Sequence, residues 1–214
     1  MKNKKAIFYI SFFIILGIAF IWYAFPLIKA KQKINDRMPV YGPNETHRVD
    51  PFSFTNQDGK TITNEDVKGK VYIVSFFYAT CPNICPKMNE NMTQVYKAIR
   101  GNKNVLILSH TVNPKRDTFQ ALKAYSLKYD ADANQWMFLT GDKKKLYDMA
   151  RYSYLISAKD DTSGVSIDQD FIHDQHFVLV DGNGQIRGLY DGLNQADITK
   201  LIADISRLLK EKNP

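Results

Sequence analysis

Residues 71–86 read VYIVSFFYATCPNICP, and this stretch decides the fold. Its first eight residues (71–78) are a continuous β-branched and aromatic run, which predicts a central strand covered on both faces. Cys81 and Cys85 follow almost at once. Pro86 can begin a helix, because the N–H that it lacks would have no partner in the first turn. The stretch therefore predicts a strand that passes into a helix, with two cysteines at the junction.

Strands and helices alternate on both sides of this junction. Asp117, with Gln120 three residues later, resembles a capping box and predicts a helix start. The pattern predicts an α/β domain with a mixed central sheet and helices on both faces, and a thioredoxin-like fold fits it. In that fold a helix N-terminus lies beneath the first sulfur and favours its thiolate. The expected strands are 52–55, 61–63, 71–78, 104–110, 136–139, 176–181 and 185–190, and the expected helices are 86–99, 117–129, 142–152 and 198–209.

The N-terminal part of the chain contains a long apolar run. Residues 6–28 are 23 positions without a charge. As a helix this run would be about 35 Å long, enough to cross a hydrocarbon core of about 30 Å. It is too long for the apolar core of a cleavable signal peptide, and no cysteine follows closely to make a lipoprotein anchor. We therefore expect a tail at 1–5, one transmembrane helix at 6–28, a polar tether at 29–47 and one domain at 48–214.

The net charge of +7 is concentrated around the apolar run. Residues 1–45 hold seven basic and two acidic residues, whereas residues 46–214 hold 22 basic and 20 acidic residues. The excess lysines flank the predicted span, where they would meet anionic lipid headgroups. The domain has no basic stripe, so nucleic-acid binding is excluded. Three lysines on each side of the span nearly balance, so charge alone does not orient the protein.

Cys81 and Cys85 are the only cysteines. A disulfide between residues four apart would close too short a loop to stabilise a fold. Two thiolates are soft donors that suit Cu(I), and the alternative is a pair of buried structural cysteines. His173 ends the loop before the sixth expected strand, which in a thioredoxin-like sheet lies opposite the cysteine turn. Thioredoxins normally carry a cis-proline there, but this chain has no proline between Pro114 and Pro214. An imidazole at this place would face the two sulfurs and complete a copper site.

The other candidate ligands have simpler structural explanations. Met88 and Met92 are spaced for one helical face, which favours core packing over thioether ligation. His176 opens a strand three positions after His173, and an odd offset along an extended chain points it to the opposite face. Asp117 is expected only as a helix cap.

Several segments resemble motifs of the Sco/SenC family of copper proteins. Residues 77–86 (FYATCPNICP) look like the metal motif of the family, and residues 111–118 (TVNPKRDT) resemble its Ser-Val-Asp-Pro-x-Arg-Asp-Thr segment. Residues 136–141 (WMFLTG) resemble its Trp-x-x-Leu-Thr-Gly strand, and His173 matches its copper-binding histidine. The resemblance extends over residues 48–209. Three positions depart from the pattern: Asn113 replaces the usual Asp, Ile172 replaces a frequent Asp, and His176 adds a second candidate imidazole.

The resemblance implies that Cys81, Cys85 and His173 bind copper, as Cu(I) or Cu(II), and that the cysteines form a redox disulfide. It implies a copper chaperone, not an enzyme, that delivers copper to the copper A centre of cytochrome c oxidase subunit II. It also implies a single-pass membrane protein whose domain lies on the non-cytoplasmic side, at the periplasmic face of a bacterial inner membrane. A copper donor and a thioredoxin-like reductant are implied partners, because the cysteines must be reduced to accept the metal.

A thiol–disulfide oxidoreductase that reduces the subunit II cysteines, or acts in redox signalling, is the alternative function. Both functions use Cys81 and Cys85, whereas only copper binding needs His173. A peroxidase is a third reading, but the active cysteine of peroxiredoxins lies in a different motif. The Cys-x-x-x-Cys spacing and the missing proline favour copper, and the balance between copper transfer and thiol reduction stays open.

Overall fold

The computed structural model of the 214-residue chain describes residues 2–35, 37–44, 46–156 and 174–211. The chain divides into two compact units, Met1–Met38 and Pro39–Pro214. The first unit is one long helix, α1 (Lys2–Asn35). Its segment Ile7–Pro26 is long and apolar enough to cross a membrane. The large apolar side chains of this segment are exposed, and an apolar surface all round a helix suits apolar surroundings.

The second unit is built on one seven-stranded mixed sheet with the strand order β2-β1-β5-β4-β3-β6-β7. The two inner pairings, β5 with β4 and β4 with β3, are parallel, and the outer strands are added antiparallel. Every residue of β3 and β4 is buried, as their continuous apolar runs predict. The strands are β1 (Ser53–Asn56), β2 (Thr61–Thr63), β3 (Val71–Phe77), β4 (Val105–Thr111), β5 (Trp136–Thr140), β6 (His176–Val180) and β7 (Ile186–Asp191).

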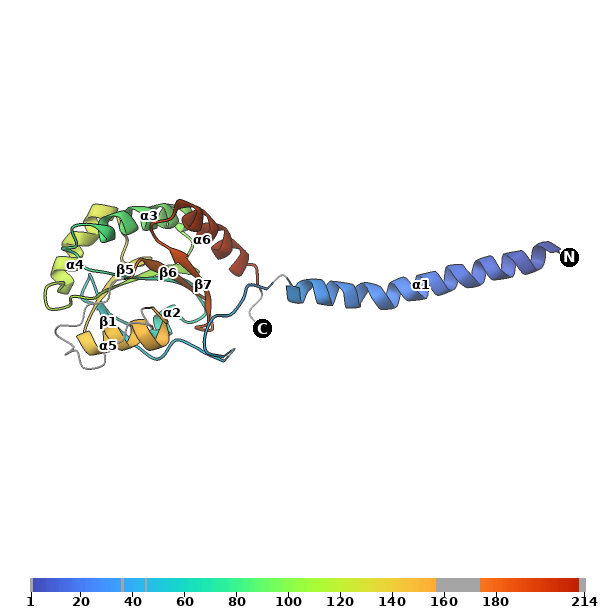
Figure 1. The fold of residues 1–214 in the computed structure, drawn as a ribbon, viewed down its shortest axis with the longest axis horizontal. Helices are drawn as coiled ribbons and strands as arrows, with labels where there is room; N and C mark the ends of the chain where they lie inside the picture. Colours follow the sequence, from blue (N-terminus) through green and yellow to red (C-terminus); the bar gives the residue numbers. More distant parts are fainter. Residues whose placement is uncertain (1, 36, 45, 157–173, 212–214) are drawn as a thin grey trace. The chain divides into compact units, whose positions relative to one another are not determined.

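Helices cover both faces of this sheet, which confirms the predicted fold class. Figure 1 shows α3, α4 and α6 along one face, and α2 and α5 along the other. The helices are α2 (Asn64–Val67), α3 (Ile84–Ile99), α4 (Phe119–Ser126), α5 (Lys143–Asp148) and α6 (Gln195–Leu208). A 3-10 turn, η1 (Leu127–Tyr129), continues α4, and a π-helical turn, η2 (Met149–Ser153), continues α5.

All four predicted helices differ from the structure in their bounds, and the differences in two of them have a clear cause. α3 begins at Ile84, two residues before the predicted start at Pro86. Pro86 still lies in the first turn, where the missing N–H breaks no helical bond. The helix predicted at 142–152 begins after the Asp142 cap, whose side chain accepts from the N–H of Lys145, but its second half has π-helical geometry.

Aromatic side chains fix both faces of β3, the strand that leads to the cysteines. On one face the Phe76 ring stacks on His110 of β4, with 5.1 Å between the ring centroids. On the other face Phe77 stacks on Tyr125 of α4 at 5.3 Å. Each fully buried aromatic residue contributes roughly 1.5–3 kcal/mol. The end of β3 is therefore a rigid base for the segment that follows it.

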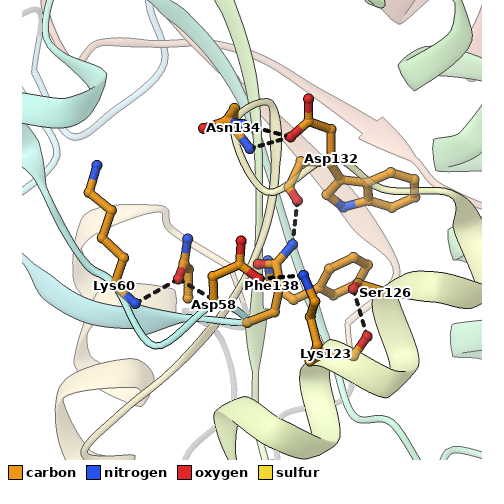
Figure 2. A network of polar contacts seen from close by, with 10 residues as sticks. Asp58, Lys60, Lys123, Ser126, Asp132, Asn134 and Phe138 are labelled. Carbon is orange, nitrogen blue, oxygen red and sulfur yellow. Dashed lines mark hydrogen bonds and ion pairs between the residues drawn. The ribbon is translucent and has the colours of Figure 1, made fainter.

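The β1–β2 hairpin is fastened to the sheet beside β5. Gln57 is 1% exposed, donates to the carbonyl of Trp136 at 2.9 Å and accepts from the N–H of Phe138 at 2.8 Å. Figure 2 shows Asp58 of the hairpin turn facing Lys123 of α4, and the two side chains form an ion pair of 2.5 Å. The hairpin is thereby bonded to both β5 and α4.

The chain joins the domain beside β7. The carbonyl of Pro39 accepts a hydrogen bond from Nε of Arg187 at 3.2 Å, and Tyr41 forms an antiparallel bridge with Ile186. The Arg187 side chain is 8% exposed and pairs with Asp181 at 2.9 Å. These contacts fix the first residues of the second unit to the sheet.

This junction and the cysteines lie at opposite ends of the sheet. β6 runs antiparallel to β3, and its last residue, Val180, lies opposite Tyr72 near the start of β3. Arg187 is bonded to Asp181, the next residue after β6. The cysteines follow the other end of β3, so the length of that strand separates them from the junction.

Candidate metal centre

The six residues between β3 and α3 form the cysteine loop (78–83), and Cys85 lies in the first turn of α3. The N–H of Cys81 donates to the carbonyl of Tyr78 at 3.2 Å, which closes a turn. Both thiols are free, and the two residues are only 9% and 6% exposed. The N–H of Cys85 donates to Sγ of Cys81 at 3.4 Å. The start of α3 thus points a helix N–H at the first sulfur.

A buried carboxylate holds the cysteine loop in place. Asp117 is 1% exposed, and its Oδ2 accepts from the N–H of Ala79 at 3.0 Å and from the hydroxyl of Thr111 at 2.5 Å. The prediction that Asp117 caps α4 was wrong, because Thr118 is the cap and accepts from the N–H of Ala121. Asp117 instead bonds the cysteine loop to the end of β4. Its local pattern fits a cap equally well, so sequence reasoning missed this role.

The two sulfurs have different electrostatic surroundings. Burial acts to raise the pKa of the Cys81 thiol, but hydrogen bonds from the backbone N–H groups of Cys85 and Asn83 hold it below its usual value. The thiol of Cys85 and the hydroxyl of Tyr78 add further hydrogen bonds to the Cys81 sulfur. Burial raises the pKa of the Cys85 thiol to about 12, although the N–H of Tyr78 opposes this. Cys81 is therefore the more readily ionised sulfur.

Both cysteines line one small cavity of about 180 Å³. Its polar or titratable lining residues are Tyr78, Cys81, Asn83, Cys85 and Asp174. Most of the remaining wall is apolar, which limits access of water to the sulfurs. The apolar lining residues are Phe76, Phe77, Pro82, Ile84, Met88 and Val112.

The two methionines proposed as core residues are buried, at 2% for Met88 and 0% for Met92. Met88 also contributes to the wall of the cysteine cavity, one turn after Cys85, whereas Met92 does not. Their helical spacing therefore reports packing, as predicted.

The histidines contribute less to the described site than the cysteines. His173 lies outside the described residues. Nδ1 of His176 is 3.0 Å from Oδ1 of Asp174, so His176 contacts a residue of the cavity wall. His47 and His110 do not line the cavity. Sequence reasoning did not single out Asp174, and its only signal was its place directly after His173.

The donors in this cavity fit a soft metal. Within the part of the chain that the structure describes, no cluster of three or more His, Cys, Asp and Glu side chains could hold a metal ion. Cys81 and Cys85 are thus the candidate ligands among the described residues. Paired thiolates suit Cu(I), whereas Mg²⁺ and Ca²⁺ prefer oxygen donors. The same sulfurs can also form a disulfide by losing two protons and two electrons to an acceptor.

Comparison with known proteins identifies relatives that match most of the second unit. The family model described as SCO1/SenC matches residues 42–210. The SCO1 protein homolog of Bacillus subtilis (strain 168) is 31% identical over 161 residues, which are 74% of this chain and 81% of that protein.

Solved structures agree with this match. BsSco, described as a member of the Sco family of cytochrome c oxidase assembly proteins with a disulfide switch, is 28% identical with a TM-score of 0.65. The match covers 81% of this chain and all of that chain. ScoI of Bradyrhizobium japonicum, solved with copper bound, is 25% identical with a TM-score of 0.59, over 75% of this chain and 99% of that chain. The sheet, the covering helices and the cysteine junction therefore form the thioredoxin-like fold of these proteins, and the chain belongs to the SCO1/SenC family.

Proposed function

We propose that this protein is a Sco-type copper chaperone that binds one copper ion through Cys81, Cys85 and His173. The observation that carries the proposal is the pair of free thiols in one largely apolar cavity. A cavity of this kind limits the competition of water for a metal held by soft ligands. The copper bound to ScoI of Bradyrhizobium japonicum supports copper as the metal that this protein carries.

The two oxidation states of copper use these ligands differently. Two thiolates satisfy Cu(I), whereas an imidazole is a borderline donor that matters more to Cu(II). Cys81 and Cys85 would therefore hold Cu(I), and His173 would add most to the binding of Cu(II). His173 directly precedes Asp174 in the sequence, and Asp174 lines the cavity of the two sulfurs, which supports His173 as the third ligand.

The acceptor of the copper is the copper A centre of cytochrome c oxidase subunit II in this proposal. The description of BsSco as a cytochrome c oxidase assembly protein supports that class of partner. α1, with its apolar segment Ile7–Pro26, would anchor the protein in the membrane that also holds the oxidase. The domain would lie on the non-cytoplasmic side, where a copper donor and a thiol reductant prepare it for each cycle.

A thiol–disulfide oxidoreductase remains the second candidate function. The difference in pKa between the two thiols favours this function, since Cys81 is the more readily ionised thiol and Cys85 stays protonated. A nucleophilic thiol with a resolving partner is the usual arrangement for disulfide exchange. The disulfide switch described for BsSco also supports a redox role.

Copper titration of the full-length protein in detergent separates the two functions. We expect one Cu(I) per chain for the wild-type protein and a loss of tight Cu(I) binding in Cys81→Ser and in Cys85→Ser. His173→Ala is expected to weaken Cu(II) binding severely and Cu(I) binding less. His176→Ala is the matched control, with a smaller effect, because among the described residues its 45% exposed side chain is not part of the cavity wall and contacts it through Asp174.

The same variants, expressed in cells that need the oxidase, report on copper delivery. We expect His173→Ala to lose oxidase assembly while the Cys81–Cys85 disulfide still forms. Active oxidase and an unchanged Cu(II) spectrum in His173→Ala would contradict the copper site and favour the oxidoreductase.

A further inference from the structure

We propose that Tyr125 and Tyr129 form an electron path through which a reductant at the surface of the domain repairs a one-electron oxidation of the cysteine pair. The damage in question is a thiyl radical, which is a cysteine that has lost one electron and one proton. This repair is a further activity of the metal-free dithiol protein, so it does not rest on the copper function proposed above.

Aromatic rings connect the wall of the cysteine cavity to solvent on the α4 side of the sheet. Phe77 lines the cavity, and its ring stacks on that of Tyr125 with 5.3 Å between the centroids. The ring of Tyr125 in turn contacts that of Tyr129 at 5.3 Å. Phe77 and Tyr125 are 2% and 5% exposed, whereas Tyr129 is half-buried and reaches solvent. Two ring contacts therefore lead from the cavity wall to the surface.

The hydroxyl groups distinguish this path from ordinary aromatic packing. Rings at these distances pack equally well as phenylalanine, and a buried hydroxyl is costly without a partner. Here the hydroxyl of Tyr129 donates to the hydroxyl oxygen of Tyr125 at 3.3 Å, and Nδ2 of Asn89 donates to the same oxygen at 2.8 Å. A phenoxyl radical can only accept hydrogen bonds, so two donors at one phenol oxygen suit the oxidised form of Tyr125.

The two faces of β3 differ in how an oxidation could leave the cavity wall. Tyrosine and tryptophan lose one electron far more readily than phenylalanine, and contact between rings allows fast transfer. On the α4 side Trp136 adjoins Tyr129 at 5.8 Å and can share the oxidation. On the other face Phe76 also lines the cavity and contacts Tyr154 at 6.1 Å, but Tyr154 is 0% exposed. An oxidation there would remain in the core, whereas one on the α4 side reaches a tyrosine at the surface.

The repair moves one electron inward and leaves no net charge behind. The thiyl radical gains an electron across the Phe77 ring and a proton from solvent, and becomes a thiol again. Tyr129 supplies the electron by way of Tyr125 and gives its hydroxyl proton to water, so that a phenoxyl radical stands at the surface. A soluble one-electron reductant such as ascorbate returns one electron, and water returns the proton. The reductant therefore need not enter the cavity.

Photolysis of the S-nitrosated protein tests the path, because light splits the S–N bond into a thiyl radical and nitric oxide. The full-length protein in detergent, free of copper, is nitrosated on Cys81 and Cys85 and illuminated. Without ascorbate, we expect an electron paramagnetic resonance signal of a phenoxyl radical that falls several-fold in Tyr125→Phe. With ascorbate, we expect the fraction of thiols recovered to fall several-fold in both Tyr125→Phe and Tyr129→Phe.

Tyr147→Phe is the matched control for these variants. Tyr147 is 1% exposed, and its hydroxyl donates to the carbonyl of Val112, another residue of the cavity wall, at 3.0 Å. Its loss should leave the phenoxyl signal and the thiol recovery unchanged. Wild-type thiol recovery in both Tyr125→Phe and Tyr129→Phe would overturn the proposal, and so would an equal loss in Tyr147→Phe. The copper titration decides the proposed function separately, since no copper enters this measurement.

Discussion

His110 is a buried side chain whose chemistry is not used. It is 0% exposed at the end of β4, and neither ring nitrogen has a hydrogen-bond partner among the described residues. The rings of Phe76, Phe54 and Tyr154 surround it, with centroids 5.1 to 5.6 Å away. Burial lowers the pKa of His110 to about 3, since the charged ring could not be solvated there. The side chain thus acts as an aromatic filler with two unpaired nitrogens.

We predict that His110→Phe stabilises the domain and flattens its pH dependence. The unfolded chain takes up a proton on His110 below about pH 6.5, whereas the folded chain stays neutral down to about pH 3. His110 therefore lowers the free energy of unfolding as the pH decreases below about 6.5, by up to about 1.4 kcal/mol per pH unit. Removing an unpaired buried nitrogen also avoids a cost of roughly 1–3 kcal/mol.

Thermal unfolding of the wild-type and His110→Phe proteins at pH 7 and pH 5 measures both effects. The variant should melt at a higher temperature at both values and lose less stability between them. An equal loss of stability on acidification in wild type and His110→Phe would contradict the role given to burial.

At the scale of elements, the junction between β3 and α3 could be predicted because its signals are local. The apolar run 71–78 and the cysteine–proline segment stand next to each other in the sequence. The order of the strands and the support of the cysteine loop depend on distant residues, such as Ala79 and Asp117, which are 38 positions apart. The cysteines of the candidate site were predicted, but Tyr78 and Asp174 were not, because aromatic and acidic residues in loops carry no distinctive spacing. The assignment of His173 as a copper ligand stays a prediction.

The link from Asp117 to the cysteine loop gives a test at this scale. In Asp117→Ala the N–H of Ala79 and the hydroxyl of Thr111 lose their partner, at a cost of roughly 1–3 kcal/mol for each buried group. The cysteine loop should loosen, and alkylation of Cys85, now 6% exposed, should become several-fold faster. Asp117→Asn keeps an acceptor oxygen and should show a smaller effect.

Thr118→Ala is the control for this prediction, because it removes the cap of α4 without touching the cysteine loop. It should destabilise the protein by about 1 kcal/mol and leave the alkylation rate of Cys85 unchanged. Equal alkylation rates in Asp117→Ala and Thr118→Ala would show that Asp117 acts on global stability alone.

At the scale of the whole molecule, the end of α1 and the first bonded residue of the domain lie close together in the sequence. The helix α1 includes residues 29–35, which the sequence suggested as part of a polar tether. From Pro39 onward the chain is bonded to β7 and to the residues around it. Only residues 36–38 stand between the last helical residue and this junction.

We predict that a fragment beginning at Pro39 folds, is monomeric and is more stable than one beginning at Glu45. The shorter fragment loses the bond from Arg187 to the carbonyl of Pro39 and the bridge between Tyr41 and Ile186. The expected cost is roughly 2 kcal/mol, or a decrease of about 4–8 °C in Tm. Thermal unfolding of both fragments measures the difference, and an Arg187→Ala version of the longer fragment should lose part of it. Identical Tm values would place the domain boundary at Glu45.

The attachment of the chain at the end of the sheet opposite the cysteines separates two kinds of contact on the domain. β3 alone accounts for about 23 Å between the two ends of the sheet, at about 3.3 Å per residue over its seven residues. Pro39 and Tyr41 are bonded to β7 and do not line the cavity of the cysteines. A partner protein can therefore approach the cavity without displacing Pro39 or Tyr41.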